Sequence, residues 1–359
     1  MITQVVTWLI TLLVVRLLSP SDYGLFGFAT FVTGIADLIA ELGLGAAIIQ
    51  KRNLDSDALD TILWMSMATG MLIYGLTWLR APAISHFFNQ ARLTEVIRLT
   101  MLAFVITAAR VIPWNLLTKH IAFARRSMAE VAATLSSSGA TLVLAYLGFG
   151  VWSLVWGFLC RSLVLTVMCL WIMPWRPRWR FSTVQLGAIM RFSAEASAAR
   201  ITWYLCSNAD ILVVGRLLGA QALGVYSLVM QLAVLPADRI TSIVNQVGLS
   251  VYSRLQHEPA RFARYFRETL ALTSLVTFPI MTGLAATAAL GVFLLLPPRW
   301  HPVAAPLQLM CVVGMVMSVS TLVAPAVLAK GRPDLALRFN LLCLAWISTD
   351  PYFPKPWQG

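Results

Sequence analysis

The sequence predicts an all-α polytopic membrane protein made of two pseudo-symmetric helical-bundle lobes, with about ten transmembrane helices and a further helical fragment. The composition is the first reason: 59% of the residues are hydrophobic and only 12% are charged, whereas soluble domains carry about 25% charged residues. Apolar segments of about 20 residues, enough to cross a bilayer, recur along the chain. An internal repeat supplies the two lobes.

The repeat aligns residues 16–26 with residues 216–226 without a gap. The two copies share an Arg-Leu-Leu run that begins at Arg16 and Arg216, a glycine, and an aromatic residue. Each copy is flanked by apolar runs that are long enough to span a bilayer. A membrane protein with two homologous halves is the usual architecture of a transporter, with the substrate path where the halves meet.

Taken in order along the chain, the apolar segments predict ten spanning helices. Their expected ranges are 2–18, 23–49, 61–79, 96–118, 129–147, 151–173, 194–218, 223–249, 269–296 and 303–329, with a fragment from about 335. The predicted domains are an N-terminal six-helix lobe (1–175), a basic cytoplasmic linker (176–193), an incomplete C-terminal lobe (194–347) and a tail (348–359). Prolines in the tail prevent the fragment from continuing as a helix, so we expect a chain that is truncated near its C-terminus.

Basic residues predict the orientation. The loops on one side hold sixteen Lys and Arg residues, and the loops on the other side hold six. Because basic loops stay cytoplasmic, the N-terminus is predicted to start inside. The same pattern explains the net charge of +12 without nucleic acid as a partner. Trp300 and His301 are expected at the opposite membrane interface, where aromatic residues collect.

Ionisable side chains inside the predicted spans are the candidate functional residues. Each costs roughly 2.5–3.5 kcal/mol at the bilayer centre, so it normally faces a cavity or a partner. Asp37 and Glu41 are four residues apart and therefore share a helix face. The other candidates are Arg110, Arg161, Glu195, Arg200, Asp210, Asp238 and Arg239. The alternative for each is a structural ion pair, or a long side chain near a helix end that reaches the interface.

A polar stripe marks the helix predicted at 223–249. Gln231, Asp238 and Asn245 recur every seven residues, and Asp37 and Asp238 occupy nearly matching positions of the two copies. The pseudo-symmetry would turn these two polar faces toward each other. The pattern therefore predicts the lining of a central water-filled cavity.

No enzymatic constellation is visible in the sequence. The four histidines are scattered in predicted loops, the five cysteines show no metal or redox spacing, and no glycine-rich phosphate loop is present. We therefore expect a protein that is not an enzyme, holds no metal and uses no cofactor.

Two stretches resemble a known family. They are residues 16–26 followed by 41–50, and residues 208–226 followed by Leu235–Arg239 and Val251–Leu255. Both are similar to the bacterial polysaccharide and oligosaccharide flippases, the lipopolysaccharide and exopolysaccharide translocases of the multidrug/oligosaccharidyl-lipid/polysaccharide exporter superfamily. The resemblance covers most of residues 1–340 and does not include residues 348–359.

The resemblance implies a function in the bacterial inner membrane. Such proteins flip an undecaprenyl-diphosphate-linked oligosaccharide from the cytoplasmic to the periplasmic leaflet by alternating access, and polysaccharide polymerase or export proteins are their expected partners. Cavity cations would bind the diphosphate, a role that falls on Arg200 and Arg239 and then on Arg161 and Arg110. The acids would pair with these arginines or bind a coupling cation, Na⁺ or H⁺; they are Asp37, Glu41, Asp210 and Asp238.

Three other interpretations stay open at this point. A cation-coupled multidrug exporter of the same superfamily would share the fold but would favour an aromatic, acidic cavity. A membrane O-antigen polymerase or ligase would be an enzyme and would be expected to need a longer periplasmic loop than residues 80–95 provide. A non-functional fragment is the third interpretation, because of the C-terminus.

Overall fold

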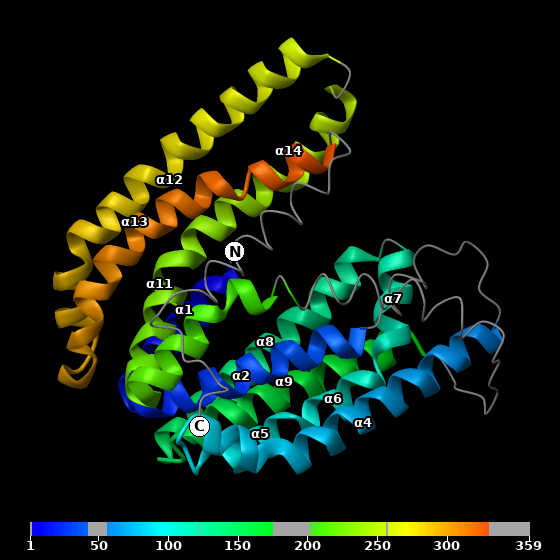
Figure 1. The fold of residues 1–359 in the computed structure, drawn as a ribbon. Helices are drawn as coiled ribbons and strands as arrows, with labels where there is room; N and C mark the ends of the chain where they lie inside the picture. Colours follow the sequence, from blue (N-terminus) through cyan, green and yellow to red (C-terminus); the bar gives the residue numbers. More distant parts are fainter. Residues whose placement is uncertain are drawn as a thin grey trace, which may run out of the picture. The chain divides into compact units, whose positions relative to one another are not determined.

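The computed structural model describes residues 2–41, 56–120, 122–174, 202, 204–255 and 258–329, and within this part of the chain every regular element is a helix (Figure 1). The predicted all-α fold is therefore confirmed. The helices are α1 (Ile2–Leu17), α2 (Pro20–Glu41), α4 (Ser56–Phe87), α5 (Leu93–Thr100), α6 (Leu102–Ala108), α7 (Val111–Lys119), α8 (Phe123–Tyr146), α9 (Val151–Ile172), α11 (Ala209–Leu255), α12 (Pro259–Leu295), the 3₁₀ helix η1 (Pro298–Val303), α13 (Ala304–Ser320) and α14 (Val323–Ala329).

Seven helices of the described residues are long and apolar enough to cross a membrane, and a bent pair makes an eighth. The bent pair replaces the single helix predicted at 96–118: α5 and α6 form one arm, α7 forms the other, and the bend between them is 53°. The fragment predicted after residue 335 lies outside the described residues.

The turn between α1 and α2 is made by a reciprocal cap. Pro20 stands at the first position of α2, where its missing N–H would have no partner in any case. The Ser19 N–H donates to Asp22 Oδ2 at 3.1 Å, and the Asp22 N–H donates to Ser19 Oγ at 3.2 Å. This is a capping box, in which two backbone donors at the helix start are satisfied by each other's side chains.

The second copy of the repeat breaks at the same place. Within α11 the residue with non-helical backbone angles is Gly219, with φ 79° and ψ −176°. Gly219 aligns with Ser19, so the two repeats share a helix break as well as a sequence. The two helices predicted at 194–218 and 223–249 therefore meet at Gly219. A backbone at this positive φ favours glycine.

The chain packs as two units, residues 1–221 and 222–359. The predicted linker, 176–193, lies outside the described residues, and the helix segment before Gln221 belongs to the first unit. In unit 1, α8 and α9 pack along each other, α1 packs on α8, and α9 also contacts α2, α5 and α6.

Close packing explains why residues 204–221 belong to unit 1. A Cβ at Gly24 would overlap the Ala220 carbonyl oxygen, and one at Gly215 would overlap the Phe28 ring. Phe28 itself contacts Phe88 with the two rings tilted and their centroids 4.4 Å apart. The break motifs of the two repeats are therefore packed directly against each other.

In unit 2, α12 and α13 lie side by side and are joined by η1 (Figure 1). Thr277 Oγ1 lies 3.1 Å from Ser318 Oγ, a hydrogen bond that links the two helices. Trp300 of η1 is 0% exposed. The indole thus packs inside the turn between α12 and α13, and its place at the membrane interface stays a prediction.

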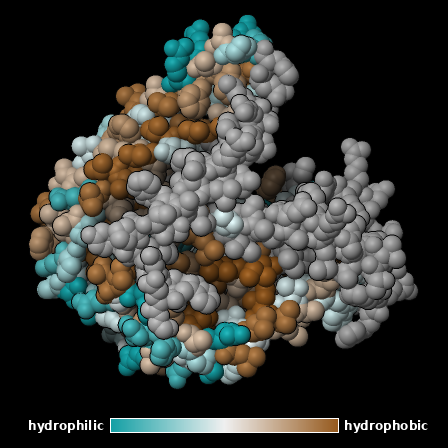
Figure 2. Space-filling model, in the orientation of Figure 1, coloured by the Kyte–Doolittle hydropathy of each residue, from teal (hydrophilic) through white to brown (hydrophobic). Residues whose placement is uncertain are grey.

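Apolar side chains gather on the outside of the described helices, as the brown areas of Figure 2 show. Leu79 of α4, Leu163 of α9, Leu275 and Leu294 of α12 and Leu309 of α13 are all more than half exposed. Such a surface would aggregate in water, but it suits contact with lipid tails. The chain is accordingly a multi-pass membrane protein.

The contact between the repeats leads to a stability prediction. We expect Gly24→Ala to lower the unfolding free energy by about 1–3 kcal/mol, the usual cost of overpacking, because its Cβ would meet backbone and not a mobile side chain. Gly139→Ala in α8 is the matched control: its Cβ would meet nothing within 4 Å, so it should be neutral or stabilising by up to about 1 kcal/mol. Unfolding of the purified variants in detergent measures both, and equal stabilities would contradict the packing.

Candidate functional site

Asp37 lies on α2 with its side chain exposed, on an otherwise largely covered helix. Phe26, Thr30 and Thr33 precede it at spacings of eleven, seven and four residues and so share its face. The two threonine hydroxyls donate to carbonyl oxygens of their own helix, at 2.9 Å for Thr30 and 2.8 Å for Thr33. The face is thus polar and internally satisfied, with one carboxylate at its far end.

Arg161 lies at the centre of α9, ten residues from Val151 and eleven from Ile172. Either end is therefore about 15 Å away along the axis. An arginine side chain is too short to reach the interface from there, so the alternative of a residue near a helix end does not fit Arg161. The side chain is nevertheless exposed.

The face of α2 that carries Asp37 meets the face of α9 that carries Arg161. The contact is an edge-to-face pair of Phe26 and Phe158 with ring centroids 6.3 Å apart. Phe158 is three residues before Arg161 and therefore on the same side of α9. Both helices start at the same end, so Asp37 lies further along than Arg161, by roughly 8–12 Å.

Arg110 occupies the bend of the broken span, between α6 and α7. It is half-buried, and its guanidinium lies 5.6 Å from the centroid of the Trp114 ring. Asp37, Arg161 and Glu130 of α8 are all close enough for charge–charge interaction with it. The structure thus brings together three of the sequence-predicted residues, Asp37, Arg110 and Arg161.

Trp114 joins Arg110 to a second arginine. The Arg126 guanidinium lies 4.0 Å from the centroid of the same ring, a cation–π contact. Arg126 also donates to Thr118 Oγ1 at 3.2 Å and pairs with Glu130 at 3.5 Å. Arg126, Glu130 and Trp114 were not among the predicted site residues; the four-residue spacing of Arg126 and Glu130 was the available signal.

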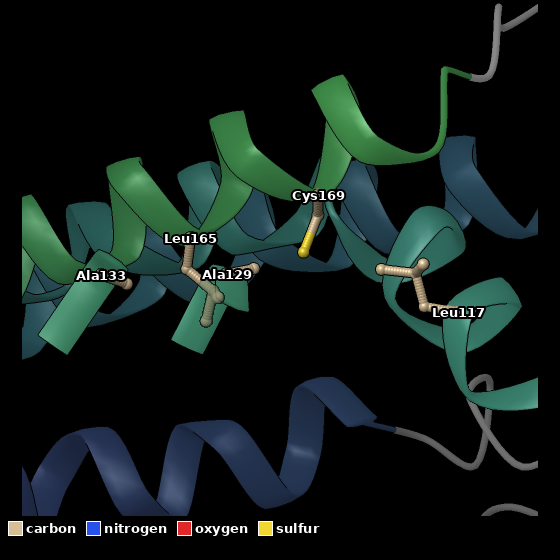
Figure 3. Close-up of a cluster of buried hydrophobic side chains, with 5 residues drawn as sticks. All are labelled: Leu117, Ala129, Ala133, Leu165 and Cys169. Carbon is tan, nitrogen blue, oxygen red and sulfur yellow. The ribbon is translucent and has the colours of Figure 1, made fainter. Parts of the chain in front are cut away.

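An apolar cluster holds this part of the chain in place. Leu117 of α7, Ala129 and Ala133 of α8, and Leu165 and Cys169 of α9 point toward one another (Figure 3). All five are nearly fully buried, and Trp114 packs against them. The bent arm α7 is therefore fixed against α8 and α9, which fixes the position of the Trp114 ring between the two arginines.

We call Arg126, Arg110, Asp37 and Arg161 the charged ladder. It runs from the basic end of α8, past the bend at Arg110, to the centre of α9, and Glu130 and Asp37 supply the counter-charges. Arginine donates in a planar fork that matches phosphate and carboxylate oxygens. The arrangement can therefore hold an anionic group among the helices of unit 1.

Tyr204 is a further neighbour of Asp37 that the sequence did not indicate. Its hydroxyl donates to the Phe31 carbonyl oxygen at 3.3 Å, and its ring stacks on Phe31 with centroids 5.9 Å apart. A Cβ at Gly34 would overlap this hydroxyl. Gly34 thus makes room for a tyrosine one turn away from Asp37.

For most of the other predicted residues the structure describes only the backbone or no position. Arg200 and Glu195 lie outside the described residues, and for Glu41, Asp238 and Arg239 only the helical backbone is described. Gln231 and Asn245 are half-buried on α11. Asp210 lies in the first turn of α11, where a carboxylate is favourable for the helix dipole.

Comparison with known proteins gives a consistent result. A family model described as "Polysaccharide biosynthesis protein" matches residues 13–305. The lipopolysaccharide biosynthesis protein WzxC of Escherichia coli K12 is 27% identical over 328 residues, 91% of this chain and 67% of that protein.

Two solved structures share the fold. The lipid II flippase MurJ in an inward closed conformation matches with a TM-score of 0.79 and 13% identity, over 97% of this chain and 80% of the other. An inward-facing multidrug resistance MATE family transporter matches with a TM-score of 0.71 and 16% identity, over 97% and 86%.

The ladder predicts an energetic coupling between two helices. In a double-mutant cycle of Asp37→Asn and Arg110→Gln, we expect a coupling of about 0.5–3 kcal/mol, because the two opposite charges are close enough to interact and each single change removes that interaction. Stability would be measured by unfolding in mixed detergent micelles. Arg80, exposed on α4, is the control partner, and Asp37→Asn with Arg80→Gln should be additive. Additivity in both cycles would contradict the pairing.

Proposed function

The chain belongs to the polysaccharide biosynthesis protein family, and on that basis we propose that it carries a lipid-linked oligosaccharide across the bacterial inner membrane. The proposed cargo is an undecaprenyl-diphosphate-linked oligosaccharide, moved from the cytoplasmic to the periplasmic leaflet by alternating access. The names of similar proteins support the glycan, and the fold shared with a lipid II flippase supports a lipid-linked cargo.

The observation that carries the proposal is the charged ladder. Its three arginines come from three different parts of unit 1, namely the first turn of α8, the bend at Arg110 and the centre of α9, with two carboxylates as counter-charges. A diphosphate-linked sugar is too polar to cross hydrocarbon unaided. We propose that its phosphates pass from Arg126 to Arg110 and then to Arg161, while the prenyl tail stays in the lipid.

Other parts of the proposal extend this route. Arg200 and Arg239 are proposed to continue it in the second half, with Asp210 and Asp238 as their acids. Asp37 and Glu41 are proposed to exchange the coupling cation, Na⁺ or H⁺. The exposed carboxylate of Asp37 on a membrane helix can be neutralised by either. Polysaccharide polymerase or export proteins are the proposed partners, and no catalytic step is assigned to the chain.

A complementation experiment tests the cargo. We expect the chain to restore surface polysaccharide in a strain that lacks its own flippase, and Arg161→Ala to lower the transport rate by about 10- to 100-fold, the loss of one or two charge-assisted hydrogen bonds. Lipid-linked precursor should then accumulate in the cytoplasmic leaflet. Arg161→Lys should keep part of the activity, since it keeps the charge but not the planar fork.

Arg80→Ala is the matched control, an exposed arginine outside the ladder, and it should transport at the rate of the unchanged chain. Full transport by Arg161→Ala at equal protein level would refute the assigned route. Resistance to organic cations without any return of glycan would instead indicate a multidrug exporter.

The orientation is tested separately by labelling. In a cysteine-free background, we expect Asn89→Cys, between α4 and α5, to react with a membrane-impermeant maleimide added outside. Arg125→Cys, in the first turn of α8, should react only after the membrane is opened, because basic loops stay cytoplasmic. The reverse pattern would place the N-terminus outside.

A further inference from the structure

Asp22 contacts a helix that begins 129 residues later in the chain. Its Oδ1 accepts a hydrogen bond from the Val151 N–H at 3.2 Å, and Val151 is the first residue of α9. The residue before it, Gly150, has φ 56° and provides no side-chain cap. A helix start leaves backbone N–H groups without an intrahelical partner, so Asp22 supplies what α9 lacks.

The same carboxylate also caps its own helix. Oδ2 accepts from the Ser19 N–H at 3.1 Å and from the Ser19 hydroxyl at 2.6 Å. Each oxygen therefore serves a different helix: Oδ2 serves the start of α2, and Oδ1 serves the start of α9. A Cβ added at Gly150 would lie 3.2 Å from Oδ1, so glycine there lets the carboxylate approach.

The two helices joined in this way carry the charged ladder. Asp37 lies fifteen residues beyond the cap on α2, and Arg161 lies ten residues beyond it on α9. Because a helix is stiff along its axis, a fixed point at both starts fixes how far along each helix its charge lies. The second copy of the repeat has Ala222 at the position of Asp22, and an alanine cannot make this cap.

We propose that Asp22 is a positioning residue, which sets the axial register of α2 against α9 and thereby the spacing of Asp37 and Arg161. The role at the site rests on the proposed function, whereas the register is a property of the folded chain alone. Asp22→Asn tests it sharply. An amide has one acceptor oxygen in place of two, so only one of the two helix starts stays capped.

Cross-linking measures the register directly. In a cysteine-free background, Phe26→Cys with Phe158→Cys reports the contact of α2 with α9, because those rings touch. A short bifunctional thiol reagent would be applied to the purified protein. Ser85→Cys with Thr94→Cys is the control pair within α4 and α5, where the two hydroxyl oxygens are 2.7 Å apart.

With Asp22→Asn we expect the yield of the 26–158 cross-link to fall by about fivefold or more, as the population moves to other registers, while the 85–94 yield is unchanged. Ser19→Ala, which leaves Val151 its partner, should lower the 26–158 yield less. Unchanged yields at both pairs would overturn the proposal. An equal fall at both pairs would also overturn it, because Asp22 would then support only folding as a whole.

Transport gives the second readout. If Asp22→Asn lowers the 26–158 yield and transport together, the positioning role is supported. If the yield falls while transport is kept, the role at the site is overturned, although the route itself stands. If the unchanged chain flips no lipid-linked glycan, the proposed function fails, and the cross-linking result still decides the register.

Discussion

A charge inside hydrocarbon costs roughly 2.5–3.5 kcal/mol on insertion scales, and the arrangement of unit 1 follows from that cost. Arg161 lies at the middle of a 22-residue apolar helix. The exposed apolar side chains of α9, including Trp156, Leu163 and Val167, form a stripe on one side of the helix. At 100° per residue, Arg161 points more than 100° away from the centre of this stripe. The lipid-facing side of α9 is therefore distinct from the side that carries the charge, which is the side that meets α2.

Backbone polar groups obey the same constraint, and they explain the caps. A helix start inside or near the membrane exposes N–H groups that lipid cannot satisfy. The start of α2 is satisfied by Ser19 and Asp22, and the start of α9 by Asp22 from a distant part of the chain. At the bend near Arg110 the backbone is satisfied by bonds of shorter range, in which the Arg110 N–H donates to the Thr107 carbonyl oxygen at 3.1 Å. The starts of α2 and α9 and the bend at Arg110 thus come with their own donors and acceptors.

The sequence predicts the helices well because a helix depends on the pattern of residues along one segment. It predicts the site less well because the site depends on contacts between segments that are far apart in the chain. Runs of apolar residues place both ends of α9 and the C-terminal ends of α8 and α12 within one residue. They miss the polar first turns of α4, α8 and α12, which begin five, six and ten residues before the predicted starts, and α4 ends eight residues later than predicted. The gap between the helices predicted at 194–218 and 223–249 contains the break at Gly219. By contrast, nothing local indicates that Arg126 stacks on Trp114, or that Trp300 is buried within a turn, since both depend on which helices become neighbours. Asp37, Arg110 and Arg161 were predicted one by one from the cost of their charge; that they form one group required the fold.

Within the repeat, a residue that both copies share and a residue that only the first copy has serve different purposes. Both copies keep the glycine at positions 24 and 224, and in the first copy a side chain there would strike the backbone of the second. The first copy has a carboxylate at position 22, which accepts from the start of α9, and the second copy has Ala222 in its place. Substitution of the shared glycine therefore acts on how the copies pack, whereas substitution of Asp22 acts on how the helices of the charged ladder are aligned. Pseudo-symmetry accounts for the break and the close packing that the two copies share. Asp22, which the second copy lacks, accounts for the position of the charges along α2 and α9.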